Sequence, residues 1–197
     1  MQNTTTLYIV CECKYVVLGL QNLLPKFQVV ESNNYFYTNN ASFLIVAPPG
    51  RPFSELIEIM VNMRKRGMNR IGLLGTEGQA VFLRGCGHPP DSIFLYDERP
   101  YILARQLHGW MMFNKEIRPS IRLTGNERQV LLASLHGETP AQFCHKNGIE
   151  KKTFYTHRLR ALKKIGLRKV NEMFINAVTG TPVSVEHYKK DIVLKYD

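Results

Sequence analysis

Short, continuously apolar runs alternate with stretches of helical spacing over the first 113 residues. Apolar runs that lack polar alternation are typical of parallel strands that are covered on both faces. The runs predict strands at residues 7–11, 43–47, 71–74 and 92–96, with a weaker one at 27–31. The stretches between them predict helices at residues 16–24, 54–66 and 101–112, the second of them capped by Ser54. This order predicts an α/β domain with a parallel sheet and helices on both faces.

The pattern changes near residue 123, where helical spacing continues without any strand-like run. Thr124 followed by Glu127 predicts a capping box at the start of one helix. Thr139 with Pro140 predicts the start of a second helix. A third is predicted at residues 151–165 and a fourth at 169–178, which together give an all-α unit of four helices.

Charge is distributed unevenly between these two parts. Residues 1–118 carry 12 basic and 9 acidic side chains, a net charge of +3, whereas residues 119–197 carry 14 and 7, a net charge of +7. Residues 145–170 alone contain nine Lys or Arg and a single acid, Glu150. Such a run repels itself unless an anion lies alongside, and duplex DNA is the usual polyanion for a helix of this width.

We therefore expect a nucleic-acid module joined to a second domain. The predicted organisation is an α/β domain at residues 1–113, a linker at 114–121, a DNA-binding domain at 122–180 and a tail at 181–197.

The N-terminal part resembles a response-regulator receiver domain. The resemblance is carried by VCECKYVVLGLQNLL, FLIVAPPGRP and IFLYDERPYILARQL. At the family's functional positions this sequence departs from the pattern. The acid pair falls on Cys11 and Glu12, the phosphoacceptor on Ala47 and the lysine on Tyr96, while a hydroxyl is kept at Thr76. Phosphoryl transfer needs a carboxylate nucleophile, a metal and a cation, so the resemblance implies a degenerate receiver.

The C-terminal part closely resembles the LuxR-type (GerE-like) helix-turn-helix over about 60 residues. The match is carried by Leu123, Thr124, Glu127, Leu131, Gly137, Ile149, Thr153, His157, Lys164, Ile165 and Gly166. It implies that the third helix lies in the major groove of DNA. Base-facing positions by resemblance are Tyr155, Thr156 and Leu159, with Lys152 nearby. Phosphate-facing positions are Thr153, His157, Arg160, Lys163 and Lys164.

Two of these assignments keep an alternative. His157 would equally serve as a packed residue, and Tyr155 as a solvated surface aromatic. The fourth helix is the dimer element of the family, which makes Met173, Phe174 and Ala177 candidates for a partner surface. They could equally pack on the first helix.

The cysteines Cys11, Cys13, Cys86 and Cys144 lack the spacing of a zinc site, and we expect no metal or cofactor. No secretory signal or apolar stretch of membrane-spanning length is visible, which favours a cytoplasmic protein. No phosphate-binding loop or nucleophile–base pair stands at diagnostic spacing, which argues against an enzyme.

The sequence therefore predicts a bacterial transcription regulator that binds specific DNA sequences and is not switched by aspartyl phosphorylation. It would act as a homodimer or as the auxiliary partner of another LuxR-type regulator, with RNA polymerase as a further candidate partner. The alternative is a protein-interaction module that modulates another regulator or RNA polymerase and binds DNA weakly. Steep salt dependence and preference for one DNA site would favour the first.

Overall fold

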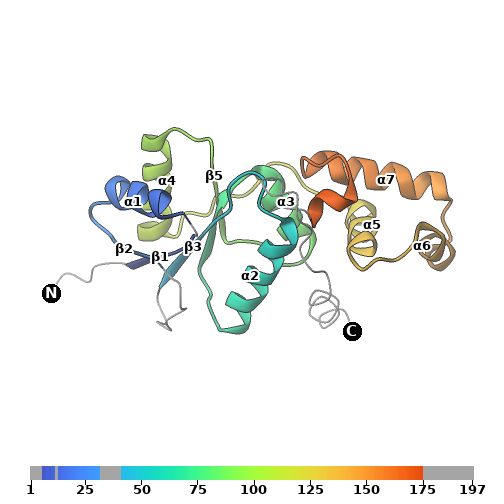
Figure 1. The fold of residues 1–197 in the computed structure, drawn as a ribbon, viewed down its shortest axis with the longest axis horizontal. Coiled ribbons are helices and arrows are strands. Elements are labelled where there is room, and N and C mark those ends of the chain that lie inside the picture. The colour runs from blue at the N-terminus through green and yellow to red at the C-terminus, as the bar shows by residue number, and fades with distance from the viewer. Residues whose placement is uncertain (1–5, 12, 32–40, 175–197) are drawn as a thin grey trace. The chain divides into compact units, whose positions relative to one another are not determined.

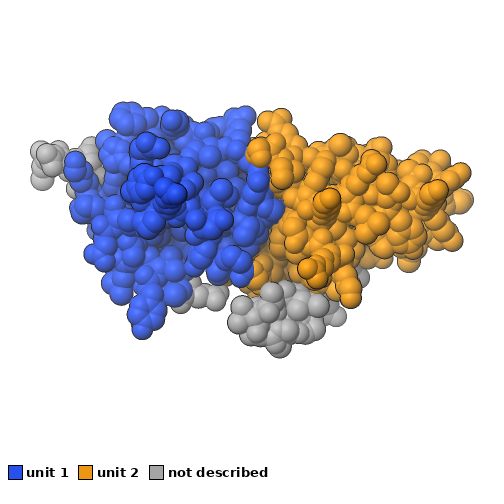
Figure 2. Space-filling model, turned by 90° about the horizontal axis from the view of Figure 1, so that it is seen from above, with its two compact units in different colours: residues 1–49, 62–80, 90–119 blue, residues 50–61, 81–89, 120–197 orange. Residues whose placement is uncertain are grey.

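The computed structural model describes residues 6–11, 13–31 and 41–174 (Figure 1). The chain divides into two compact units, coloured separately in Figure 2. Unit 1 contains residues 1–49, 62–80 and 90–119, and unit 2 contains residues 50–61, 81–89 and 120–197. Within the described part of the chain, no helix is both long enough and apolar enough to cross a membrane.

Unit 1 is built on a parallel sheet of five strands in the order β2-β1-β3-β4-β5. Leu7 of β1 lies opposite Ser42 of β3, and Phe43 lies opposite Ile71 of β4. The strands span Thr6–Val10 (β1), Gln28–Glu31 (β2), Ser42–Val46 (β3), Ile71–Gly75 (β4) and Ser92–Leu95 (β5). Strand order that runs outward in both directions from β1 is the doubly wound arrangement. The predicted fold class is confirmed.

Helices α1 (Lys14–Leu23) and α4 (Pro100–Phe113) pack beside each other on this sheet (Figure 1). Trp110 of α4 is fully buried and meets Phe94 of β5 edge to face, with ring centroids 5.4 Å apart. A Cβ on Gly72 would lie 3.0 Å from both rings, so glycine lets the two rings pack closely against β4. The apolar runs thus became buried strands because both their neighbours and the helices above them are apolar.

Helices α2 (Phe53–Lys65) and α3 (Glu77–Gly85) connect β3 to β4 and β4 to β5. The prediction of Ser54 as the cap of α2 was wrong, because the helix already begins at Phe53. The Ser54 hydroxyl is buried and has no hydrogen-bond partner among the described residues. Helix α3 was not predicted. Its start signal is Thr76, whose hydroxyl accepts from the Gln79 N–H at 3.2 Å while the Gln79 amide oxygen accepts from the Thr76 N–H.

Unit 2 contains the helices α5 (Gly125–Leu135), α6 (Pro140–Asn147) and α7 (Lys151–Lys164), followed by the short 3₁₀ helix η1 (Val170–Met173). The predicted capping box of Thr124 and Glu127 is confirmed, as is Thr139 with Pro140 at the start of α6. Gly148 ends α6 at φ 63°, a left-handed conformation that favours glycine. Of the predicted fourth helix only η1 is described, since its remainder lies outside the described residues.

Candidate nucleic-acid interface

Helix α7 is held on its inner side by apolar contacts with α5 and α6. Phe154, Ala161 and Leu162 are buried, and the Phe154 ring lies 5.3 Å from that of Phe143 on α6. These three positions fall on one stripe of the helix, which fixes its rotation about its own axis. The residues that remain outside are therefore set by this packing.

The outer side of α7 carries the positions predicted to contact DNA. Tyr155 is 42% exposed and Leu159 is 63% exposed, four residues apart on one side of the helix. Lys152, Thr153, Thr156, Arg160 and Lys163 are also exposed. These predicted residues are therefore exposed on α7, and the major groove of DNA is wide enough to admit an α-helix.

The region around α7 is strongly basic. Seven of the nine Lys and Arg side chains between residues 145 and 170 are exposed, namely Lys146, Lys151, Lys152, Arg160, Lys163, Arg168 and Lys169. Within the described residues none of the seven forms an ion pair. Exposed cations without an internal counter-ion create a positive potential that attracts a polyanion. Lys151 at the start of α7 is exposed as well, although it was not predicted to contact DNA, and the charge run already contained the signal.

Lys164 differs from the other cations of the run. Its Nζ donates to Glu127 Oε2 at 2.7 Å and to the Arg122 carbonyl oxygen at 3.0 Å. The Glu127 side chain is only 4% exposed, and the Lys164 side chain is 32% exposed. The ammonium group is therefore engaged inside unit 2, and the structure gives it an internal partner where the resemblance implied a phosphate.

The same carboxylate also completes the cap of α5, because Glu127 Oε2 accepts from the Thr124 N–H at 2.8 Å. Burial would raise the pKa of Glu127, but hydrogen bonds from Lys164 and Thr124 and the Lys164 charge bring the pKa below its ordinary value. A charged side chain that is buried needs such partners. Lys164 thus fixes the end of α7 to the start of α5.

Two of the predicted DNA-contacting residues have part of their hydrogen-bonding capacity directed inward. The Thr156 hydroxyl donates to the Lys152 carbonyl oxygen at 2.9 Å, which uses its only donor. His157 is half-buried, and its Nδ1 is buried without a hydrogen-bond partner among the described residues. His157 therefore has both a packed part and an accessible part, and the two predicted roles stay open.

Arg158 is stacked on aromatic rings. Its guanidinium carbon lies 4.6 Å from the centroid of the Tyr155 ring and 5.5 Å from that of the Phe154 ring. The Phe154 and Tyr155 rings meet edge to face at 5.7 Å. A guanidinium over a ring face at this distance is attracted to it. Arg158 thus connects the buried side of α7 to its exposed aromatic residue.

Glu150 precedes α7 at its N-cap position and makes no side-chain capping hydrogen bond. Its charge still lies at the positive end of the helix dipole, where an acid is favourable. It is the only acid among residues 145–170. Glu150 therefore offsets only part of the positive charge that Lys151 and Lys152 place at the first turn.

The residues predicted for dimerisation are in different environments. Met173 in η1 is fully buried, which favours the packing alternative for this residue. Phe174 is half-buried, and Ala177 lies outside the described residues. Of the described pair, Phe174 is the one with accessible surface.

The positions that the receiver resemblance singled out lie at the carboxyl ends of the strands of unit 1. Ala47 follows β3, is fully buried, and its N–H donates to the Leu74 carbonyl oxygen at 2.8 Å. Tyr96 follows β5 and is 39% exposed. Cys11 follows β1 and is half-exposed, whereas Glu12 lies outside the described residues.

A neutral network occupies the ends of β3 and β4. The buried Gln79 amide donates to the Pro48 carbonyl oxygen at 3.3 Å and accepts from the Thr76 N–H at 2.8 Å. A Cβ on Gly75 would lie 2.6 Å from the Gln79 oxygen, so this side chain fills the space above β4. Thr76 serves here as the start of α3, with its hydroxyl bound to Gln79.

The thiols differ in exposure. Cys13 is exposed, whereas Cys86 and Cys144 are buried. Burial raises the pKa of Cys86 to about 12, against a smaller lowering by Arg128, so this thiol stays protonated. Among the described residues no three His, Cys, Asp or Glu side chains are grouped so as to hold a metal ion.

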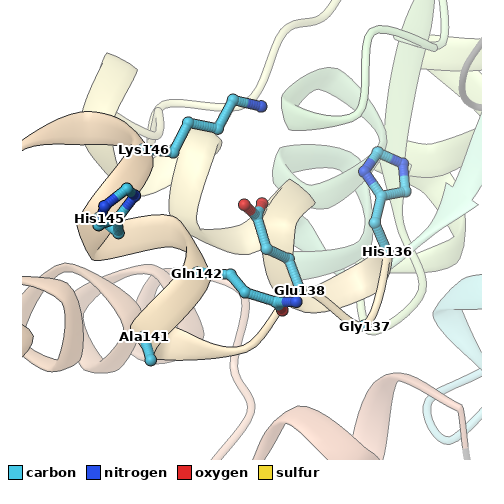
Figure 3. Close-up of a pocket in the computed structure, with 7 residues that line it drawn as sticks. All are labelled: His136, Gly137, Glu138, Ala141, Gln142, His145 and Lys146. Atoms are coloured by element: carbon cyan, nitrogen blue, oxygen red, sulfur yellow. The ribbon is translucent and has the colours of Figure 1, made fainter.

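A shallow hollow in unit 2 is lined by the end of α5 and by α6 (Figure 3). His136 and Glu138 lie on the connection between these helices, and Gln142, His145 and Lys146 lie on α6. Burial lowers the pKa of His136, although the Glu138 charge opposes this. The hollow is open and mixed in charge, so it has neither the enclosure nor the convergent polar groups of a small-molecule site.

Comparisons with known proteins gave structural matches only, since neither a family model nor a curated protein matches the chain. The chain is similar to the structure of two RcsB dimers bound to two parallel DNAs, with 19% identity, TM-score 0.49, and coverage of 85% of this chain and 94% of that chain. RcsB from Salmonella enterica serovar Typhimurium bound to a promoter gives 17% identity, TM-score 0.49, and coverage of 90% and 100%. The response regulator ChrA of a heme-sensing two-component system gives 16% identity, a TM-score of 0.38, and coverage of 86% of this chain and 94% of that chain. At this distance the matches assign no ligand or partner to the chain.

Proposed function

We propose that this protein is a bacterial transcription regulator of LuxR type that binds specific DNA sequences through α7. The observation that carries the proposal is the outer face of α7, which exposes Tyr155 and Leu159 together with cations that form no ion pair with any described residue. Cations bound to phosphates supply affinity, and neutral side chains at base edges supply sequence preference. A face that combines both kinds of residue is suited to specific binding, whereas cations alone would give only non-specific binding.

The proposal includes a receiver-like half that aspartyl phosphorylation does not switch. Ala47 offers no nucleophile at the end of β3, and Tyr96 offers no permanent cation at the end of β5. The neutral Gln79 network between Pro48 and Thr76 supports this, because it satisfies the local polar groups without a phosphoryl group. Control would then come from the amount of protein or from its partner.

For assembly we propose a homodimer or an auxiliary pairing with another LuxR-type regulator, with Phe174 as a described candidate for contact. RNA polymerase remains a candidate partner in transcription. We further propose that the functional boundary lies at residues 114–121, with the DNA-binding domain at 122–180.

The test is sequence selection from random duplex DNA by the full-length protein, alone and with candidate LuxR-type partners. A motif recovered alone supports an autonomous homodimer, and its two half-sites should then be related by symmetry. A motif recovered only with a partner supports an auxiliary subunit. Recovery of no motif in either case would overturn the proposal and favour a protein-interaction module.

A receiver-like half that is not phosphorylated should not be restored by an aspartate at the phosphoacceptor position, in the variant Ala47→Asp. Because Ala47 is fully buried, the new carboxylate is removed from water, and we expect a loss of about 2–3 kcal/mol in the free energy of unfolding. Chemical denaturation measures this loss. Intact mass after incubation with acetyl phosphate and Mg²⁺ should show no phosphoryl group on the wild type or the variant.

The matched control for this prediction is Tyr96→Phe, which changes an exposed residue of the same strand-end set and should alter stability by less than about 0.5 kcal/mol. A wild-type protein that takes up a phosphoryl group and changes its DNA affinity would refute this part of the proposal.

A further inference from the structure

We infer that the sequence preference of α7 is centred on thymine, read through its C5-methyl group by Tyr155 and Leu159, and that Arg158 is the positioning residue for Tyr155. The inference rests on the proposed DNA-binding function and specifies what that face recognises.

Tyr155 and Leu159 form an apolar pair on an otherwise charged face. Their side chains are 42% and 63% exposed, and their spacing of four places them as neighbours on the helix. Exposed apolar groups on a groove-binding helix have one apolar counterpart in the major groove, the thymine methyl. Contact with it would remove from water surface that the free protein exposes.

The alternatives for hydrogen-bonded base reading are few in the first two turns of α7. Residues 151–157 contain no Asn, Gln or Arg, the side chains that bind adenine or guanine through two hydrogen bonds. The Thr156 hydroxyl has already donated to Lys152 within the helix. Lys151, Lys152 and the Thr153 hydroxyl remain for hydrogen bonds to a base. Apolar contact by Tyr155, continued by Leu159 in the next turn, is the other mode of discrimination that this face offers.

Arg158 limits the freedom of the Tyr155 ring. The guanidinium lies 4.6 Å from the centroid of the Tyr155 ring, and the Phe154 ring meets it edge to face at 5.7 Å. These two contacts restrict the orientation of the Tyr155 ring. A side chain that is already ordered loses less entropy on binding. Arg158 therefore orders the Tyr155 ring by stacking, which is the positioning role that we infer for it.

The test begins with the motif selected by the full-length protein, in which each thymine is replaced in turn by deoxyuridine. This change removes only the methyl group. We expect roughly fourfold weaker binding for each contacted methyl, by fluorescence anisotropy, at one or two positions per half-site. Sensitivity at one position should disappear in Leu159→Ala and at another in Tyr155→Ala, and Tyr155→Phe should keep it.

The control Lys163→Ala should weaken binding to the thymine and uracil duplexes by the same factor, because a phosphate contact does not depend on the base methyl group. For Arg158, a double-mutant cycle separates positioning from direct contact. Arg158→Ala should reduce uracil sensitivity at the Tyr155 position in the wild type and have no further effect in Tyr155→Ala. Thermal unfolding of each variant checks that the fold is kept.

The outcomes distinguish the two levels of the proposal. If no motif is selected, the DNA-binding function fails and the thymine inference with it. If a motif is selected but no thymine in it is sensitive to uracil replacement, the function stands and the inference is overturned. Loss of sensitivity in Tyr155→Phe would mean that the hydroxyl reads the base instead, which would also overturn it. An equal effect of Arg158→Ala in both backgrounds of the cycle would remove Arg158 from the positioning role.

Discussion

Replacing Lys164 with methionine should lower the free energy of unfolding of the helical part by about 3 kcal/mol. The substitution keeps the aliphatic stem but leaves Glu127, 4% exposed, without its cation. Removing one partner of such a pair leaves an uncompensated buried charge. The free-energy cost of that charge exceeds the net stabilisation that the intact pair provides. The midpoint of thermal unfolding should fall by roughly 12 °C or more for a domain of this size, measured by circular dichroism.

The matched control is Lys163→Met, the neighbouring lysine, which is exposed and has no ion pair in the described structure. We expect its stability to change by less than about 0.5 kcal/mol, while its DNA affinity falls. A second variant, Glu127→Gln combined with Lys164→Met, should recover part of the loss because no charge stays buried. Equal midpoints for the two single lysine variants would show that the Glu127–Lys164 contact does not stabilise the fold.

The same pair predicts an acid dependence. Because the folded pKa of Glu127 is lowered by Lys164 and Thr124 against the opposing effect of burial, the unfolded chain binds the proton more tightly. The stability that this difference contributes is fully present above the unfolded pKa of about 4.3 and is lost as the pH falls through the folded pKa. The wild type should therefore lose its advantage over Glu127→Gln in that acid range. Denaturation curves at a series of pH values measure the difference.

Local patterns in the sequence predicted most of the fold. The strands and the capping box of Thr124 and Glu127 were predicted because their signals lie within a few residues of one another. Helix α3 was missed because its apolar residues follow a buried strand after a single turn, and only the pair Thr76 and Gln79 marks its start. Ser54 was misplaced because a serine before an apolar run signals a cap only if the helix begins after it.

The site required information that no local pattern holds. Lys164 belongs to the same charge run as Lys163, and only its packing against a residue 37 positions earlier removes it from the exposed face. The sequence leaves the role of Arg158 open, because its position on the helix wheel allows either an outward or an inward role. Met173 was likewise open between packing and partner contact, and its burial follows from tertiary structure. Charge and periodicity therefore located the helix, and packing decided which cations stay available.

That division of cations leads to the largest expected effect on binding. The double variant Lys152→Glu and Lys163→Glu reverses two exposed cations on the outer face of α7 and leaves the Lys164 contact intact. Each phosphate contact contributes about 0.9 to the slope of log affinity against log salt, so the slope should fall by about 2. With repulsion added, we expect at least a hundredfold weaker binding to any duplex at about 0.15 M salt.

The control is Lys14→Glu with Lys26→Glu, which makes the same change in net charge on exposed residues of the N-terminal half. Its salt slope should equal that of the wild type, because these side chains lie outside the basic helix. Anisotropy titrations over a range of salt concentrations give both slopes. If the two double variants weaken binding alike, the affinity comes from the overall charge of the protein and not from α7. A lower slope in the α7 variant alone, at unchanged thermal stability, would locate the phosphate contacts on the exposed cations of this helix.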